Sequence, residues 1–147
     1  MDAVSANRTA PPESRAGRSA PRIVFVLDQW PVGEGLGHDA FTTIANWRGY
    51  GAIEHDGLVY GQKAHAFRSL FPIPTRSTER FAVALAIHPD EANDLYALCV
   101  NGWRLLDPAR LAGTPDSYQR FIAGSKAELG IAKSGYVTAD CGWFSDR

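Results

Sequence analysis

The stretch that decides the fold is FAVALAI, residues 81–87, in which every position is apolar. A strand with one face in water alternates apolar and polar residues, whereas a strand covered on both faces is apolar throughout. The run therefore predicts a central strand of a parallel sheet, and it is the best candidate for the core.

Segments of strand and helix type alternate before this run. Residues 41–47, FTTIANW, are rich in β-branched and aromatic side chains and predict a strand. Residues 62–71 place apolar side chains on one face of a predicted helix. Between these two elements, residues 53–55 and 58–60 flank Asp56-Gly57, a dipeptide suited to a type I′ turn, so we expect a hairpin there.

The alternation continues after the run. Residues 90–100 predict a helix that ends at Asn101-Gly102, because glycine accepts the left-handed conformation that stops a helix. The residues that we expect on its buried face are Ala92, Leu95, Tyr96 and Cys99. Residues 103–106 predict a short strand, and Thr114-Pro115-Asp116 has the cap, proline and early acid of a helix start. Residues 128–132 predict the last strand.

This order of elements predicts an α/β fold, a Rossmann-like, doubly wound and mostly parallel sheet with flanking helices. Such sheets bind ligands in the loops at the carboxyl ends of their strands. We expect residues 1–21 to be a disordered leader, because their Ala, Ser, Arg and Pro have little apolar surface to bury. Residues 22–40 would hold a short strand and a linker, and residues 41–147 the α/β domain.

Composition narrows the function. The chain has 147 residues and a formal net charge of -1, which fits one domain and gives no basic footprint for nucleic acid. No apolar run reaches the length of a membrane span, and the N-terminus lacks a secretory signal, so we expect a cytoplasmic protein. The two cysteines are expected to be reduced, and the four histidines lack the spacing of a metal site. The expected partner is a small molecule or a protein.

A phosphate site needs close backbone N–H groups and a nearby cation, and the end of the chain offers both. Lys133, Gly142, Ser145 and Arg147 follow the last predicted strand at its carboxyl end. The alternative is that the two cations are solvated and the glycine only turns the chain.

Two further cations follow the first predicted strand of the domain. Arg48 opens a short glycine-containing turn that resembles part of a phosphate loop, although an ordinary turn has the same residues. Lys63 begins the next helix, where it could face a bound anion or simply lie on the surface. His38 and Asp39 are candidates for an acid or base, but one sequence assigns no catalytic residue.

Three stretches resemble the C-terminal, donor-binding domain of bacterial glycosyltransferase-like proteins with a GT-B fold. They are AFTTIANWRGYGAIEHDGLVYGQKAHAF, NGWRLLDPARLAGTPDSYQRFIAGSKAELGIAKSGYV and CGWFSDR, and the likeness spans about residues 22–147. The resemblance implies a domain that holds the diphosphate of a nucleotide sugar, with the acceptor on a separate N-terminal domain. The donor- or phosphate-binding residues that we expect are Arg48, Lys63, Lys133, Ser134, Gly142, Trp143, Ser145, Asp146 and Arg147.

The resemblance also implies an incomplete enzyme. Transfer requires donor and acceptor to be aligned between two domains, and the acceptor domain has no counterpart in this sequence. We therefore expect a glycosyltransferase fragment that is inactive alone and that needs a partner chain or the missing domain. The nucleotide sugar would be its substrate, with no metal and no other cofactor. The alternatives are a stand-alone, non-catalytic module that binds a nucleotide or a protein, and a truncated gene product.

Overall fold

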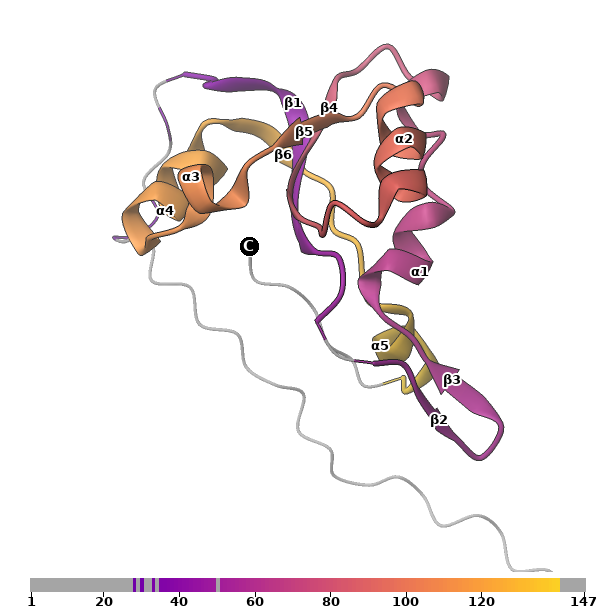
Figure 1. Cartoon of the computed structure of the whole chain (residues 1–147). Coiled ribbons are helices and arrows are strands. Elements are labelled where there is room, and N and C mark those ends of the chain that lie inside the picture. Colours follow the sequence, from indigo (N-terminus) through magenta and orange to yellow (C-terminus); the bar gives the residue numbers. More distant parts are fainter. Residues whose placement is uncertain (1–27, 29, 31–32, 34, 50, 141–147) are drawn as a thin grey trace, which may run out of the picture.

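Four parallel strands form the main sheet, in the order β5-β4-β1-β6 (Figure 1). The computed structural model describes residues 28, 30, 33, 35–49 and 51–140. The strands are β1 (His38–Asn46), β4 (Phe81–Ala86), β5 (Arg104–Leu106) and β6 (Ser125–Glu128). The chain is an α/β protein with a Rossmann-like sheet, as its alternating elements predict.

The predicted central strand is confirmed. β4 lies between β1 and β5, and its residues from Phe81 to Leu85 are buried. Its register with β1 runs from Phe41 opposite Phe81 to Asn46 opposite Ala86. The apolar run forms this strand because both of its faces are covered.

Helices lie on both faces of the sheet (Figure 1). One face carries α1 (Lys63–Arg68) and α2 (Ala92–Val100), and the other carries α3 (Pro108–Ala112) and α4 (Pro115–Ala123). A short 3-10 helix, η2 (Pro74–Arg76), precedes β4. The hairpin of β2 (Ile53–His55) and β3 (Leu58–Tyr60) extends away from the sheet, and α5 (Ser134–Thr138) packs against β3.

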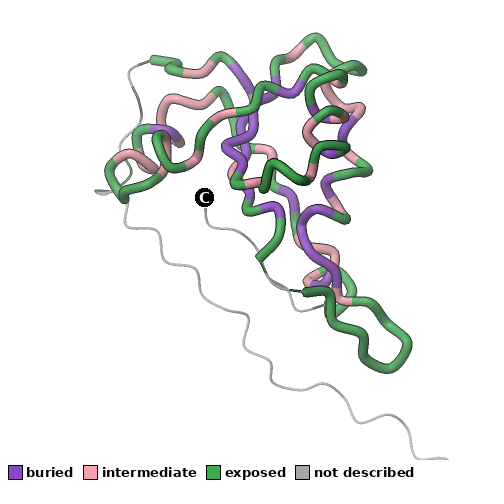
Figure 2. Tube along the Cα trace, viewed as in Figure 1, coloured by how far each residue is buried: buried purple, intermediate pink, exposed green. Residues whose placement is uncertain are grey.

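The core is an aromatic cluster between β1, β4 and the α1–α2 face. The rings of Trp47, Phe67, Phe71, Phe81 and Trp103 contact one another, with centroids between 5.0 and 6.1 Å apart. Both indole N–H groups in the cluster donate hydrogen bonds, as buried donors require. Buried residues accordingly follow β1 and β4 through the centre of the molecule (Figure 2).

Local turn and cap chemistry follows the prediction. Asp56 and Gly57 have φ angles of 50° and 72°, and positive φ at both central residues is what a type I′ turn requires. Gly102, with φ of 86°, follows α2 in the left-handed conformation. The side chain of Thr114 accepts a hydrogen bond from the backbone N–H of Ser117 and caps α4.

The predicted buried face of α2 is wrong. Asp94 and Leu98 are the residues that α2 buries, whereas Ala92, Tyr96 and Cys99 are exposed and Leu95 is half-buried. The reason is the carboxylate of Asp94, which accepts hydrogen bonds from Trp47 and Arg68 and so turns that side of the helix toward the sheet. A pattern based on apolar residues alone places such a carboxylate in water.

The last strand is also displaced from its prediction. β6 is Ser125–Glu128, and residues 129–133 have no regular structure. Backbone pairing with β1 and a hydrogen bond of 2.8 Å from the Thr42 hydroxyl to the Ser125 hydroxyl hold it there. No pattern in the sequence predicted α3. The expected leader, residues 1–21, lies outside the described residues, as does the run IVFVL at residues 23–27, where the short strand of the 22–40 segment was expected. A separate finding is that none of the helices in the described residues has the length and apolar character to cross a membrane.

We expect Phe67→Ala to lower the free energy of unfolding by about 3–5 kcal/mol, because it leaves a cavity in the aromatic cluster. Phe67 has no exposed surface, whereas Val137, which is 70% exposed, serves as a control position. Urea denaturation should show a change within about 0.5 kcal/mol for Val137→Ala. A loss below about 1 kcal/mol for Phe67→Ala would place the core elsewhere.

Candidate functional site

The chain changes direction at β1. β4 and β5 are added on one side of β1 through α1 and α2, and the chain then passes through α3 and α4 to place β6 on the other side. The connections that leave β1 and reach β6 therefore run on opposite faces of the sheet. In open α/β sheets, ligands bind at such a switch point, outside the carboxyl ends of the strands.

A cavity lies at this point of the structure. Its volume is about 270 Å³, close to the lower limit of roughly 300 Å³ for small-molecule sites. It lies between the end of β1, the start of α1 and the segment after β6. The described residues that line it are Ile44, Asn46, Trp47, Gly49, Gln62, Lys63 and Lys133. This set includes two lysines and no carboxylate.

Lys63 is buried, which is unusual for a lysine. It therefore does not lie on the surface, which was the alternative left open by its place in the sequence. Its ammonium group donates a hydrogen bond of 3.2 Å to the backbone carbonyl of Ile44 on β1. The bond ties the first turn of α1 to the carboxyl end of β1, so Lys63 is held at the cavity by both elements.

Lys133 reaches the same cavity from the other side of the switch point. It occupies the N-cap position of α5, is half-buried and has its ammonium group 5.4 Å from the ring centre of Tyr136. A cation over an aromatic face is attracted by the ring, which favours one position of this long side chain. The fold therefore brings two cations from distant parts of the sequence to one cavity.

Gln62 is a residue of the cavity that the sequence analysis missed. It is 7% exposed, and its side-chain carbonyl oxygen is buried and has no hydrogen-bond partner among the described residues. Its backbone N–H donates to Nδ1 of His65 at 3.1 Å. A buried acceptor without a donor costs free energy, which a donor group of a ligand would offset. Asn46 was missed too, although a polar residue at the carboxyl end of a strand in a parallel sheet indicates a ligand site.

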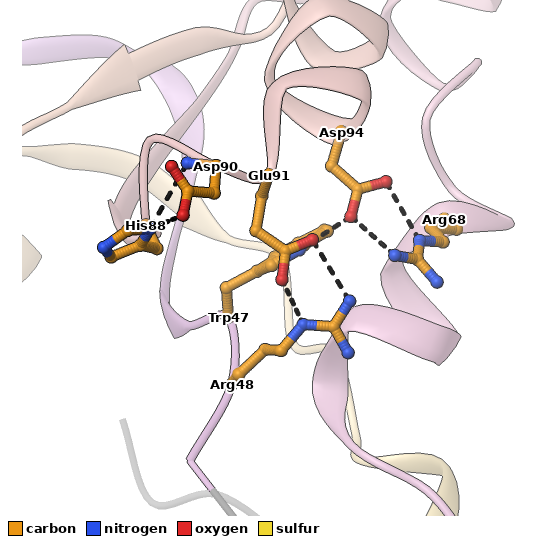
Figure 3. A network of polar contacts seen from close by, with 7 residues as sticks. All are labelled: Trp47, Arg48, Arg68, His88, Asp90, Glu91 and Asp94. Atoms are coloured by element: carbon orange, nitrogen blue, oxygen red, sulfur yellow. Dashed lines mark hydrogen bonds and ion pairs between the residues drawn. The ribbon is translucent and has the colours of Figure 1, made fainter.

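Arg48 is next to the cavity but directed elsewhere. Its guanidinium forms a two-pronged ion pair with Glu91, in which Nε contacts Oε1 and Nη2 donates to Oε2 at 3.1 Å (Figure 3). The hydrogen bond from Arg48 lowers the pKa of Glu91, and the same bond raises the pKa of Arg48. The side chain therefore joins β1 to the start of α2, while Gly49 beside it lines the cavity.

Beside this ion pair, Asp94 joins three elements (Figure 3). It accepts a hydrogen bond of 2.8 Å from the indole of Trp47 and two from Arg68, at 2.9 and 2.7 Å. The hydrogen bonds from Arg68 hold the pKa of Asp94 below its ordinary value of 3.8, and the bond from Trp47 acts in the same direction. Trp47 is thus fixed as a wall of the cavity and as part of the core.

The other expected site residues lie apart from this cavity or outside the described part of the chain. Ser134 opens α5 beside Lys133 but does not line the cavity. His38 and Asp39 begin β1 at the opposite edge of the sheet, where Asp39 pairs with Arg80. The remaining expected residues, Gly142, Trp143, Ser145, Asp146 and Arg147, lie outside the described residues.

Two other hollows are less suited to a phosphorylated ligand. One of about 430 Å³ lies at the amino edge of the sheet, and its lining holds the cations of Arg80 and Arg104 together with the carboxylates of Asp39 and Glu79. The Asp39 carboxylate pairs with Arg80, so this hollow is not free of competing negative charge. Another of about 220 Å³ lies between α4 and the sheet and contains no cation among its described lining residues. Within residues 28–140, as far as they are described, no group of three or more His, Cys, Asp or Glu side chains is arranged to hold a metal ion.

We expect Asp94→Asn to lower the free energy of unfolding at pH 7 by about 1.5–3 kcal/mol, because the charged partner of Arg68 is lost. The pKa of Asp94 is depressed in the folded chain, so its contribution is full above pH 3.8 and is lost as the pH falls through the folded-state pKa. Urea denaturation from pH 7 to pH 3 should therefore show the two chains converging in acid. Asp90→Asn is the matched control, because the Asp90 side chain is 90% exposed. A gap between wild type and Asp94→Asn that stays constant with pH would contradict this role.

Comparison with known proteins gives no family for this chain. No protein-family model matches it, and no curated protein or solved structure is significantly similar to it. The resemblance to glycosyltransferases therefore stays a hypothesis, and the function has to be argued from the geometry of the switch point.

Proposed function

We propose that the chain binds a nucleotide through its phosphates, in the cavity at the carboxyl end of β1. The observation that carries this proposal is the pair of lysines, Lys63 and Lys133, in a cavity whose described lining holds no carboxylate. Ammonium groups form strong, charge-assisted hydrogen bonds with phosphate oxygens. The place of the cavity, at the switch point of a parallel sheet, supports the same class of ligand.

The nucleotide sugar is the finer part of this proposal. A resemblance of sequence to GT-B donor domains suggests it, and the Rossmann-like sheet is compatible with it. In this hypothesis Lys63 and Lys133 neutralise the diphosphate, which becomes the leaving group when the sugar is transferred. Gly49 allows a close approach of the ligand to the backbone, and the amide of Gln62 supplies a neutral hydrogen-bonding group.

Binding is better supported than catalysis by this chain alone. The described lining holds no His, Asp, Glu or Cys that could serve as a general base or nucleophile. A glycosyl transfer at this cavity would need such a group, and the acceptor, from elsewhere. We therefore propose a donor-binding part of a glycosyltransferase, with a non-catalytic nucleotide-binding module as the second candidate. Sugar transfer by this chain to any acceptor, without a second protein, would contradict the proposal that the chain binds the donor but does not catalyse transfer alone.

Isothermal titration calorimetry tests the ligand class. We expect UDP, GDP or dTDP to bind the wild-type chain, and the corresponding nucleoside to bind far more weakly, because the lysines act on phosphate. Lys133→Gln should weaken nucleotide binding about tenfold or more, the effect of losing one charged hydrogen bond. Raised salt should weaken it as well.

Lys126→Gln provides the matched control for this experiment. Lys126 lies on β6 and contacts Glu79, away from the cavity, so its replacement should leave the affinity unchanged. Equal losses of nucleotide affinity in the two variants would indicate nonspecific electrostatic attraction. If none of the three nucleotides gave a heat of binding, the proposal would be wrong.

A further inference from the structure

Two glycines meet where the segments that carry the two lysines of the cavity cross. Gly61 directly precedes Gln62 and Lys63, and Gly135 follows Lys133 by two positions. Both glycines are buried, and the backbone N–H of Gly135 donates a hydrogen bond of 3.0 Å to the backbone carbonyl of Gly61. The segment that leads into α1 is therefore in direct backbone contact with the first turn of α5.

This contact leaves no room for a side chain on either glycine. A Cβ atom on Gly135 would lie 3.1 Å from the carbonyl oxygen of Gly61 and 3.2 Å from the carbonyl carbon of Tyr60. Ordinary contacts between heavy atoms are about 3.5–4.0 Å, so the two segments would have to move apart. A Cβ atom on Gly61 would overlap Oγ of Ser134 and lie 2.8 Å from Nδ1 of His65. The atoms that border Gly135 belong to the backbone, which cannot turn away as a side chain can.

Each lysine is held on its own side of this contact. The ammonium group of Lys63 donates to the backbone carbonyl of Ile44, and that of Lys133 lies 5.4 Å from the ring centre of Tyr136 on α5. Because each cation is held by its own segment, the distance between the two segments sets the distance between the two cations.

We propose that the contact between Gly61 and Gly135 positions Lys63 and Lys133 for one phosphorylated ligand. This inference rests on the proposed function, because it concerns the same cavity. Neither glycine is among the described residues that line the cavity, so both are positioning residues that act through the lysines. Charge-assisted hydrogen bonds are short, about 2.7–2.9 Å, and they weaken when a displaced ammonium group no longer reaches the phosphate.

Calorimetry of the full chain tests the proposal, with whichever of UDP, GDP and dTDP the wild-type chain binds most tightly. A long lysine side chain can follow a small displacement, so the loss of affinity should grow with the size of the residue at position 135. Gly135→Ala should weaken binding, and Gly135→Val should weaken it about tenfold or more, the effect of losing the charged hydrogen bond of Lys133.

Gly130→Ala is the matched control. Gly130 lies in the segment between β6 and Lys133, and a Cβ atom there would meet nothing within 4 Å among the described residues. This variant should bind the nucleotide as tightly as the wild-type chain.

A double-variant cycle separates positioning of Lys133 from general damage to the structure. In a Lys133→Gln background, Gly135→Val should cause no further loss of affinity, because the cation that it displaces is already gone. A further loss as large as the one in the wild-type background would overturn the inference. If the valine variant does not fold, Gly135→Ala takes its place in the cycle, because alanine favours a helix more than glycine does.

The same measurements distinguish this inference from the proposed function. If the wild-type chain binds none of the three nucleotides, both are wrong. If the wild-type chain binds and Lys133→Gln weakens binding, but both Gly135 variants bind as tightly as the wild type, the inference alone is wrong.

Discussion

The structure depends on one buried carboxylate. Asp94, in the first turn of α2, accepts hydrogen bonds from Trp47 at the end of β1 and from Arg68 at the end of α1. Burying a carboxylate is unfavourable unless it is paired and hydrogen-bonded, and both partners are present here. The result is a fixed meeting point of the three elements that border the carboxyl edge of the sheet.

The candidate site follows from that meeting point. The indole of Trp47 donates a hydrogen bond to Asp94 and packs against Phe67 and Phe71. These contacts fix the position of the chain directly after β1. Lys63 then returns to β1 through its bond to the carbonyl of Ile44. The cavity proposed to bind phosphate therefore has a fixed wall on the β1–α1 side, and Lys133 comes from the segment after β6. The same orientation of α2 leaves Tyr96 and Val100 exposed among the described residues.

The sequence predicts those parts of the fold that depend on local chemistry or on complete burial. The run at residues 81–87 has only one consistent place, between two covered faces, and the Asp56-Gly57 turn is set by its own backbone preferences. The rotation of α2 is not predictable in this way, because it is set by Asp94, whose partners lie far away in the sequence. β6 escapes prediction because its pairing with β1 uses backbone groups, and its residues, SKAE, have no strand preference.

The candidate site was predictable only in part, because its residues carry local signals but their meeting depends on contacts between distant parts of the sequence. Lys63 and Lys133 are recognisable as cations near strand ends, but their meeting at one cavity results from the crossing that places β6 beside β1. Arg48 has the same sequence signal as Lys63, and only the structure shows that Glu91 holds it. Gln62 has no signal in the sequence, because its importance comes from a buried oxygen without a partner among the described residues.

The most direct test is a nuclear magnetic resonance titration of the labelled chain with UDP. If the nucleotide binds by its phosphates at the switch point, the backbone amides of Asn46, Gly49, Gln62 and Lys133 will shift together and saturate at one affinity. Shifts that gather instead around Arg80 and Arg104, at the amino edge of the sheet, or no saturable shifts at all, would contradict the account.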